Sequence, residues 1–518
     1  MKKRIIKAAL ILIITGIIAT IGIIEVNSDS YSDKNFYYAI ADGEKIEMFE
    51  NDGIYYLFLP SYLDAEDVRL SGNAKKLPAD KICIMESDAV ATVYINLKNG
   101  SLDEVYEDKE HTLSGEIRTV YEDGREDKDL KLASFHGRGN YSWNTWDKKS
   151  FSIGLKKEDS LLGLNAGFGY ALLSNASDPT LIRNEIGHSL EEAVGREFYV
   201  KGEFADLYVN GEYLGNYYIS PTIEVGADRI NITDLEESMD AVYHKSNKNA
   251  FSPIEEDRYK AVDIKDYVED TTGGYVLEGE FVERYEAELD DIKGAVVTEN
   301  EEYFVVKSPS YISENQAIYL ADRFDEAERA ILSKDGIDSV SGKRLDELVN
   351  LESIAKRYLV EETLKNYDGG VSSEYYYKDS DLIDGRICAG PGWDYDMSLG
   401  NYLDWMDYKH ESAEGLTKLK NTSTDALWYE ALYDKEDYKN IVTAVYKESC
   451  EPCLAELIDK GIDEYYDRLK ASAAMDAVRW SSMYEDFGYS VTDKGEYEKL
   501  KSFIAERKAF LDKEWITE

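Results

Sequence analysis

Residues 389–401 read AGPGWDYDMSLGN and form the densest cluster of unusual residues in the chain. They follow a short strand-like run and carry two carboxylates two positions apart, Asp394 and Asp396. In an extended backbone such side chains point the same way, and paired carboxylate oxygens are the ligands that Mg²⁺ and Ca²⁺ require. The alternative is a solvated turn, because a chain with 104 acidic residues contains such pairs by chance.

A third carboxylate lies one predicted hairpin upstream of this pair. Asp368 ends a helix that we expect from about Leu351, and two short strands at 374–378 and 386–389 separate it from residues 389–401. This spacing lets all three carboxylates converge on one pocket. The arrangement suits phosphoryl transfer, in which one Asp orients or deprotonates a hydroxyl and others hold the metal. An acidic residue before Gly-Gly is also ordinary turn chemistry.

Phosphoryl transfer also needs backbone N–H groups and a cationic side chain that bind phosphate, and residues 137–155 offer both. The segment GRGNYSW at 137–143 contains glycines that let backbone amides approach an oxyanion. A lysine at the start of the following strand, Lys148 or Lys149, would supply a point charge. Strand alternation puts the two lysines on opposite faces, and both assignments stay open. The alternative is a tight turn followed by a solvated lysine pair.

The composition limits the classes of protein. A chain of 518 residues predicts about three to four folding units. Its 43% apolar residues, with 41 Tyr and 7 Trp, suffice for globular cores. The 59 basic and 104 acidic residues give a net charge of −45, which repels nucleic-acid phosphate, so we exclude nucleic acid as a partner. Five His argue against imidazole-rich metal centres, and we expect oxygen ligands.

The N-terminus is typical of a targeting segment. Four basic residues within the first seven positions precede an uncharged, apolar run at 8–24. The run is near the lower length limit for crossing a bilayer, and the positive-inside bias puts the rest of the chain outside the cytoplasm. We predict that residues 1–30 anchor the protein in a membrane. The alternative is a cleaved signal and a secreted protein.

The rest of the chain is typical of the α+β class. Strand-like runs and turns over 35–90 predict a small β-rich accessory domain. Residues 207–218 place Asn-Gly between two apolar runs, which predicts a β-hairpin. Asp178 followed by proline at 179 predicts a helix N-terminus. Apolar stripes with helical spacing lie at 351–359, 438–446 and 500–511, and they predict a helical C-terminal part from about residue 405.

Four cysteines in a chain of this length do not make a disulfide scaffold. Cys450 and Cys453 form a CxxC, but no second pair completes a four-thiolate zinc site. We predict either a local disulfide or two ordinary thiols there.

Taken together, these segments resemble the CotH family, the spore-coat-protein-H-type atypical protein kinases. The resemblance covers about residue 90 to at least residue 401, and several motifs in one order are more specific than any one of them. The matching pieces are Arg138-Gly139-Asn140 with Trp143, Lys148-Lys149, Asp178 with residues 181–184, the hairpin at 208–215, residues 274–278, Asn366 with Asp368, and residues 390–396.

The resemblance implies a highly diverged protein-kinase-like domain over residues 91–518. It implies transfer of the γ-phosphate of ATP, with Mg²⁺, to Ser or Thr of a protein. Asp368 resembles the catalytic aspartate, and Asp394 and Asp396 resemble the metal-binding pair.

The resemblance also implies how ATP is held. Lys148 or Lys149 resembles the lysine that binds the phosphates. The expected cofactor-binding turn contains Arg138, Gly139 and Asn140. Glu185 follows Asp178 on the expected helix, whose place resembles that of the helix which orients the lysine in ordinary kinases. We therefore expect Glu185 to pair with the lysine. This chain has Pro-Gly-Trp-Asp at 391–394 where the family usually has Pro-Val-Trp-Asp, and the HRD signature of ordinary kinases is absent.

Two classes of function follow from these observations. As a kinase, the acidic chain would attract protein substrates with basic, Ser/Thr-rich segments. As a non-catalytic cell-surface or spore- or wall-associated binding protein, it would keep the fold and use its β-rich N-terminal part and abundant Tyr to contact carbohydrate or another protein. Glycoside hydrolysis also uses paired carboxylates, but it requires a separation of about 5 to 9 Å that a sequence does not give. The sequence does not predict an oligomeric state.

Overall fold

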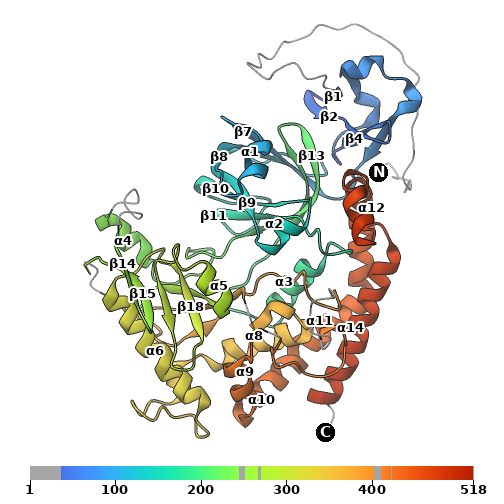
Figure 1. The fold of residues 1–518 in the computed structure, drawn as a ribbon. Coiled ribbons are helices and arrows are strands. Elements are labelled where there is room, and N and C mark those ends of the chain that lie inside the picture. Colours follow the sequence, from blue (N-terminus) through green and yellow to red (C-terminus); the bar gives the residue numbers. More distant parts are fainter. Residues whose placement is uncertain are drawn as a thin grey trace.

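The computed structural model describes residues 37–243, 251–265, 270–370, 372–401, 410–421 and 423–516. Helices and strands are mixed, as the α+β class predicts. Figure 1 shows a β-barrel in the upper part of the molecule, a second sheet to the lower left and a mainly helical part to the lower right. The predicted anchor at residues 1–30 lies outside the described residues. No helix in the described part of the chain is both long and apolar enough to cross a bilayer.

The N-terminal strands form two small sheets of three strands each, in the orders β2-β1-β5 and β3-β4-β6. The strands are β1 (Tyr37–Ala41), β2 (Glu44–Glu47), β3 (Phe49–Asn51), β4 (Ile54–Leu59), β5 (Arg69–Gly72) and β6 (Ile82–Glu86). Their apolar core includes Phe58 and continues into Tyr208 and Tyr213 of the barrel and Met475 near the C-terminus. The region is β-rich, as expected, and it shares its core with the rest of the molecule. Its independence as a domain stays a prediction.

Seven strands close into a barrel in the order β10-β11-β13-β12-β7-β8-β9. The elements of this part are β7 (Ala91–Lys98), α1 (Leu102–Glu107), β8 (Leu113–Val120), β9 (Leu130–Arg138), α2 (Tyr141–Thr145), β10 (Ser150–Asp159), β11 (Gly167–Leu173), β12 (Glu203–Val209) and β13 (Glu212–Pro221). The predicted hairpin is confirmed as β12 and β13. Asn210 and Gly211 form its turn with φ of 52° and 91°, the left-handed values that a two-residue hairpin loop requires.

The predicted helix after Asp178 begins later than the sequence suggests. Helix α3 runs from Arg183 to Ala193, and the expectation that it starts at Pro179 is wrong. Asp178 caps a preceding turn instead, because its carboxylate accepts from the backbone N–H groups of Thr180 (2.9 Å) and Arg183 (2.8 Å). Leu181 has φ of 65°, so a regular helix cannot pass through this turn.

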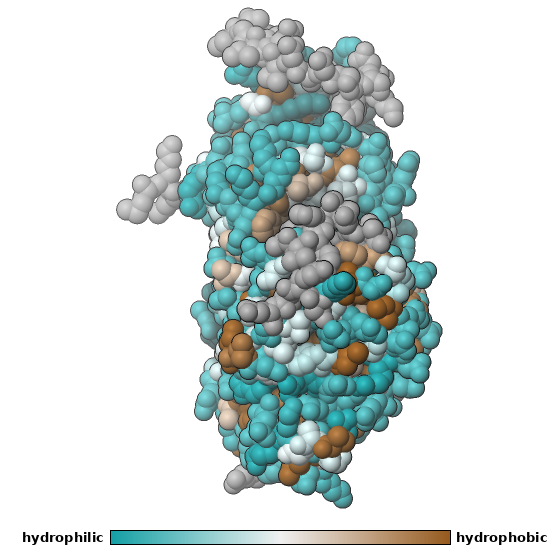
Figure 2. All heavy atoms as spheres, turned by 90° about the vertical axis from the view of Figure 1, so that its left-hand side faces the viewer, coloured by the Kyte–Doolittle hydropathy of each residue, from teal (hydrophilic) through white to brown (hydrophobic). Residues whose placement is uncertain are grey.

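The second sheet has seven strands in the order β14-β15-β17-β18-β16-β19-β20. Its strands are β14 (Pro253–Glu256), β15 (Tyr259–Val262), β16 (Tyr275–Glu280), β17 (Ala295–Val297), β18 (Tyr303–Ser308), β19 (Glu374–Lys378) and β20 (Cys388–Ala389), and its helices are α4 (Leu235–Tyr243), α5 (Val282–Ala287) and α6 (Glu314–Leu332). Tyr275 and Leu277 of β16 join the main core together with α6, while Glu278 and Glu280 alternate with them. Figure 2 shows that the face of the molecule on this side is mainly hydrophilic, with scattered apolar side chains.

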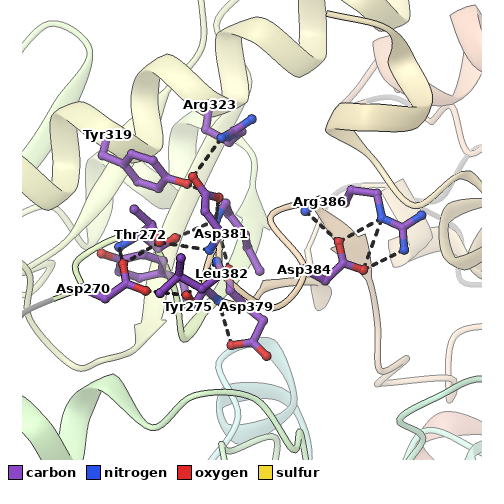
Figure 3. A network of polar contacts seen from close by, with 12 residues as sticks. Asp270, Thr272, Tyr275, Tyr319, Arg323, Asp379, Asp381, Leu382, Asp384 and Arg386 are labelled. Atoms are coloured by element: carbon purple, nitrogen blue, oxygen red, sulfur yellow. Dashed lines mark hydrogen bonds and ion pairs between the residues drawn. The ribbon is translucent and has the colours of Figure 1, made fainter.

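The predicted hairpin at 374–389 is confirmed as β19 and β20. Polar contacts hold its turn against α6, as Figure 3 shows. Asp381 accepts hydrogen bonds from the Tyr319 hydroxyl (2.7 Å), Lys378 Nζ (2.8 Å) and Arg323 Nη2 (3.2 Å). The turn of the hairpin is therefore fixed. Residues 389–401 leave from the other end of the hairpin, after β20.

The C-terminal part is helical, and all three predicted apolar stripes lie on helices. Its elements are α7 (Leu345–Leu348), α8 (Leu351–Leu364), α9 (Leu427–Tyr433), α10 (Glu436–Val445), α11 (Glu451–Glu456), α12 (Ile462–Arg479), α13 (Ser481–Phe487) and α14 (Lys494–Trp515). The buried helix α8 packs on α3 and α10, and α12 packs against β13 of the barrel. Cys450 and Cys453 are both free thiols, so the ordinary-thiol alternative holds and a local disulfide does not.

Candidate active site

The three aspartates singled out in the sequence come from two segments that lie side by side. Asp368 lies in a 3₁₀ turn (Tyr367–Gly370) that follows α8, while Asp394 and Asp396 lie in the loop after β20. The backbone joins the segments, since Tyr367 N donates to Met397 O (3.2 Å) and Leu399 N donates to Leu364 O (2.8 Å). The three side chains are half-buried, and their charges act on one another.

Burial and mutual repulsion make these carboxylates less acidic than usual. Burial first, and then Asp396, raise the pKa of Asp368 to about 7. Burial and the charge of Asp394 raise the pKa of Asp396 to about 8, and the two carboxyl groups share a hydrogen bond. Burial and Asp368 raise the pKa of Asp394 as well. Like charges held together in this way are stabilised by a cation placed among them.

The donor set fits Mg²⁺ completed by a substrate better than a preformed cage. In the described part of the chain, no three His, Cys, Asp or Glu side chains are close enough together to hold a metal ion. Mg²⁺, however, commonly binds one or two carboxylates and takes its other ligands from phosphates and water. Asn366 lies beside the acids, and its buried Oδ1 has no hydrogen-bond partner among the described residues. The Nδ2 group of Asn366 donates to Glu361 (2.9 Å) and to the Asp394 carbonyl (3.3 Å).

Helix α3 and the turn before it fix the loop that carries the acidic pair. The Tyr395 N–H donates to Asn184 Oδ1 (2.8 Å), Arg183 Nε donates to Ser398 O (3.0 Å), and the Gly392 N–H donates to Glu191 (2.7 Å). Two further contacts reach Asp396 itself: Ser177 Oγ donates to its carboxylate, and Asn401 Nδ2 donates to its carbonyl (2.7 Å). The conformation of the loop is therefore set by residues about two hundred positions earlier in the chain.

Close packing explains why glycine occupies position 392. A Cβ there would overlap the Tyr395 hydroxyl and would lie 2.7 Å from Glu191 Oε1. The same Glu191 carboxylate accepts from the Gly392 N–H, so the backbone and the glutamate are already in contact. A larger residue at 392 must displace the loop or the Tyr395 ring.

Two arginines bring positive charge to the acidic cluster. Arg138, at the end of β9, lies over the Trp393 ring at 5.0 Å, and its charge acts on Asp394. Arg284, on α5, acts on both Asp368 and Asp394. The sequence pointed to Arg138 but not to Arg284. The signal for Arg284 was weak, because it lies six residues after the motif at 274–278 and has no motif of its own.

The expected lysines have other partners. Lys148 is fully buried, and its Nζ contacts Asp476 Oδ1 (2.7 Å) on α12 and the Asn216 carbonyl (2.7 Å) on β13. Lys149 donates to the carbonyls of Trp143 (2.5 Å) and Trp146 (2.6 Å). In the described contacts, the positive charges that act on the aspartates come from the arginines.

Glu185 does not pair with either lysine in the described contacts, which corrects the sequence-based expectation. Its carboxylate accepts from the hydroxyls of Tyr218 (2.8 Å) and Tyr465 (2.9 Å). Asp476 takes the place beside Lys148 that was expected for Glu185. Gly215 leaves room for this ion pair, because a Cβ there would overlap Asp476 Oδ1 and would lie 3.0 Å from the Lys148 side chain.

The rest of the predicted cofactor-binding turn is on the barrel. Gly139 has φ of 101°, and Asn140 precedes the short helix α2. Lys109 Nζ donates to the Gly139 carbonyl (3.1 Å) and to Asn140 Oδ1 (3.3 Å), which ties the turn to the barrel. Since the turn begins next to Arg138, it lies at the barrel end that faces Trp393.

A separate recess of about 170 Å³ lies behind the acidic loop, lined in part by Arg196, Ser353 and Ala389. Arg196 is buried there, and its guanidinium donates to the carbonyls of Ser353 (3.1 Å) and Ala389. Its donors are used in joining α8 to the end of β20. We therefore interpret this recess as a structural feature.

The family model described as CotH kinase protein matches residues 135–511. The matched part begins in β9 and ends in α14, and it includes Arg138, α3 and all three aspartates. No curated protein matches the chain significantly.

Proposed function

The chain belongs to the CotH family, and from this premise we propose that it is a protein kinase which transfers the γ-phosphate of ATP to Ser or Thr of a protein substrate with the help of Mg²⁺. The observation that carries the proposal is the convergence of Asp368, Asp394 and Asp396 from two segments. Three carboxylates whose charges act on one another, with arginine charges acting on them, are the groups that phosphoryl transfer uses.

Each aspartate has a role in this proposal. Asp368 orients the substrate hydroxyl and accepts its proton. Asp394 and Asp396 would hold Mg²⁺, which, when bound, neutralises charge on the phosphates and aligns them. Asn366, with its buried unpaired Oδ1, is a further candidate ligand. The contacts from Asn184 and Arg183 keep the loop in one conformation, so the two carboxylates are positioned before the substrate binds.

Lys148 has a structural role in this proposal and does not bind the phosphates. The Lys148–Asp476 pair holds the barrel against α12, and so fixes the barrel that carries Arg138. ATP binding by Lys149, Gly139 and Asn140 remains a prediction. The charge of −45 favours basic, Ser/Thr-rich substrate segments, and their phosphorylation should weaken as ionic strength rises.

The test is transfer of radiolabel from γ-labelled ATP to a synthetic peptide of alternating Lys and Ser, with Mg²⁺ and the full-length chain. We expect Asp368→Asn and Asp394→Asn to lower the rate by about 100-fold or more, since each removes a group that acts in the transition state. Asp346→Asn is the matched control, because Asp346 is exposed and pairs with Arg344 on the surface. Equal rates in the wild type and both site variants would refute the proposal.

A second candidate is a non-catalytic binding protein of the same family. One observation favours it: the contacts of Lys148 and Lys149 are with other groups, not with the aspartates. Titration calorimetry with ATP and Mg²⁺ separates the two candidates. Binding that is lost in Asp394→Asn supports the kinase, while the absence of any nucleotide binding supports the second candidate.

A further inference from the structure

The arginine on α5 lies where the second sheet meets the acidic cluster. Strand β16 is antiparallel to β19, with Gly279 opposite Glu374. Beyond this pair, β16 continues through Glu280 into α5. The segment before β19 leads back from Ser373 to the turn that carries Asp368. Helix α5 therefore begins beside the segment that carries Asp368. Figure 1 shows α5 at the inner side of the sheet, toward α3 and α8.

A buried glutamate ties these two segments together. Glu278 on β16 accepts a hydrogen bond from the Ser373 N–H (3.2 Å), and it forms an ion pair with Lys307 of β18 (2.7 Å). The side chain of Glu278 is almost completely buried. The position of α5 relative to Asp368 is thus fixed through the strand from which the helix starts.

The Arg284 side chain is held in place from both sides along its own segment. Nη1 contacts Glu280 Oε1 (3.3 Å), and Nε donates to Glu288 Oε1 (3.1 Å). Among the described residues, Nη2 donates no hydrogen bond. The side chain keeps 26% of its surface exposed, so the guanidinium is oriented but still accessible.

The charges around Arg284 suggest what it binds. The charges of Glu280, Glu278 and Glu288 act on Arg284, and the charge of Arg284 in turn acts on two of the three aspartates, Asp368 and Asp394. A nucleotide triphosphate in the site would add further negative charge, which requires cations besides the metal. A guanidinium matches phosphate oxygens with parallel N–H groups, as a lysine ammonium does not. Arg138 supplies one such group from the barrel, and Arg284 supplies another from the sheet.

We propose that Arg284, together with Arg138, binds the phosphate oxygens of the nucleotide and stabilises the phosphoryl group during transfer. This inference rests on the proposed kinase function. In the step, the substrate hydroxyl oxygen forms a bond to the γ-phosphorus while the bond from the γ-phosphorus to the bridging oxygen breaks. The hydroxyl proton passes to the Asp368 carboxylate, and ADP leaves with the bridging oxygen.

The test compares Arg284→Gln, Arg284→Lys and the control Arg329→Gln in the full-length chain. Arg329 is also a partly buried arginine with two acidic partners, Asp338 and Glu299, but it lies on α6 away from the acids. We expect Arg284→Gln to lower kcat/KM for ATP by at least about 30-fold, Arg284→Lys to recover part of this, and Arg329→Gln to stay within about 3-fold of the wild type.

A binding measurement separates phosphate contact from a structural effect. Inorganic tripolyphosphate with Mg²⁺ should inhibit the wild type, and its inhibition constant should rise at least about 10-fold in Arg284→Gln. An active wild type with unchanged kcat/KM and inhibition in Arg284→Gln overturns this inference alone. A wild type with no transfer overturns the proposed function and this inference with it. If Arg284→Gln does not fold, Arg284→Lys decides: an inhibition constant raised about 3-fold or more supports the inference, and an unchanged one overturns it.

Discussion

Removing the charge of Asp476 should destabilise the protein strongly. The Lys148–Asp476 pair has no exposed side-chain surface on either partner. Asp476 Oδ1 also accepts from the Asn216 N–H (2.8 Å), and Oδ2 accepts from the Tyr484 hydroxyl. Burial lowers the pKa of Lys148, while the charge of Asp476 opposes that effect. In Asp476→Asn the buried ammonium would lose its ion-pair partner, and only the weaker effect of the Asp206 charge would remain.

The expected loss in the free energy of unfolding is about 3 to 5 kcal/mol, as for other buried pairs that lose one partner. The double variant Lys148→Met with Asp476→Leu should lose less than Asp476→Asn alone, because it removes both charges of the ion pair together. The surface pair of Asp467 and Lys470 serves as the control, since Asp467 is largely exposed and Lys470 is about one-third exposed. Asp467→Asn should change the free energy by less than about 1 kcal/mol.

Urea unfolding followed by tryptophan fluorescence and far-ultraviolet circular dichroism measures these differences. Trp480, at the end of α12, donates to the Leu214 carbonyl of β13, and Trp146 contacts Phe487 of α13, so fluorescence reports on this region. If Asp476→Asn unfolds within about 1 kcal/mol of the wild type, the ion pair does not hold the barrel against α12, and the reasoning fails.

Two further predictions concern single residues near the candidate site. Burial lowers the pKa of His188 to about 3. As pH falls below about 6.5, only the unfolded chain therefore takes up a proton at this residue, and the free energy of unfolding decreases by up to about 1.4 kcal/mol per pH unit. Between pH 7 and pH 5 the wild type should therefore lose about 2 kcal/mol more than His188→Gln in urea unfolding, and equal losses would contradict the assignment. Gly392→Val should lower phosphate transfer by at least about 10-fold, because its side chain overlaps the Tyr395 hydroxyl, and adding Tyr395→Phe should restore part of the rate. A Gly392→Val variant with the wild-type rate would show that the loop tolerates the larger residue.

Local chemistry explains which parts of the fold could be predicted from the sequence. The Asn210–Gly211 turn needs two left-handed residues in a row, and Asn-Gly is the pair that supplies them. The β19–β20 hairpin was predictable for a similar reason, since a polar turn separates two short apolar runs. The start of α3 was not, because Asp178 caps a turn through contacts that resemble those of a helix N-cap.

Long-range contacts explain what was missed at the candidate site. The three aspartates could be grouped because a single hairpin separates them. The partner of Lys148 comes from a helix near the other end of the chain, and no local pattern marks Asp476 as that partner. Glu185 was predicted to pair with the lysine by analogy of position, but its carboxylate accepts hydrogen bonds from two tyrosine hydroxyls instead. Arg284 depends on the pairing of β16 with β19, which a sequence pattern does not give.

The packing of α12 on the barrel also bears on how the protein is made. Strands β12 and β13 are synthesised long before the helix that covers them, and Lys148 has no counter-ion until residue 476 has left the ribosome. A nascent chain therefore carries a barrel whose α12-binding face is uncovered until α12 has been made, a period in which chaperones would have to shield that face. A premature stop codon after residue 401 would spare all three aspartates and still leave this face of the barrel uncovered.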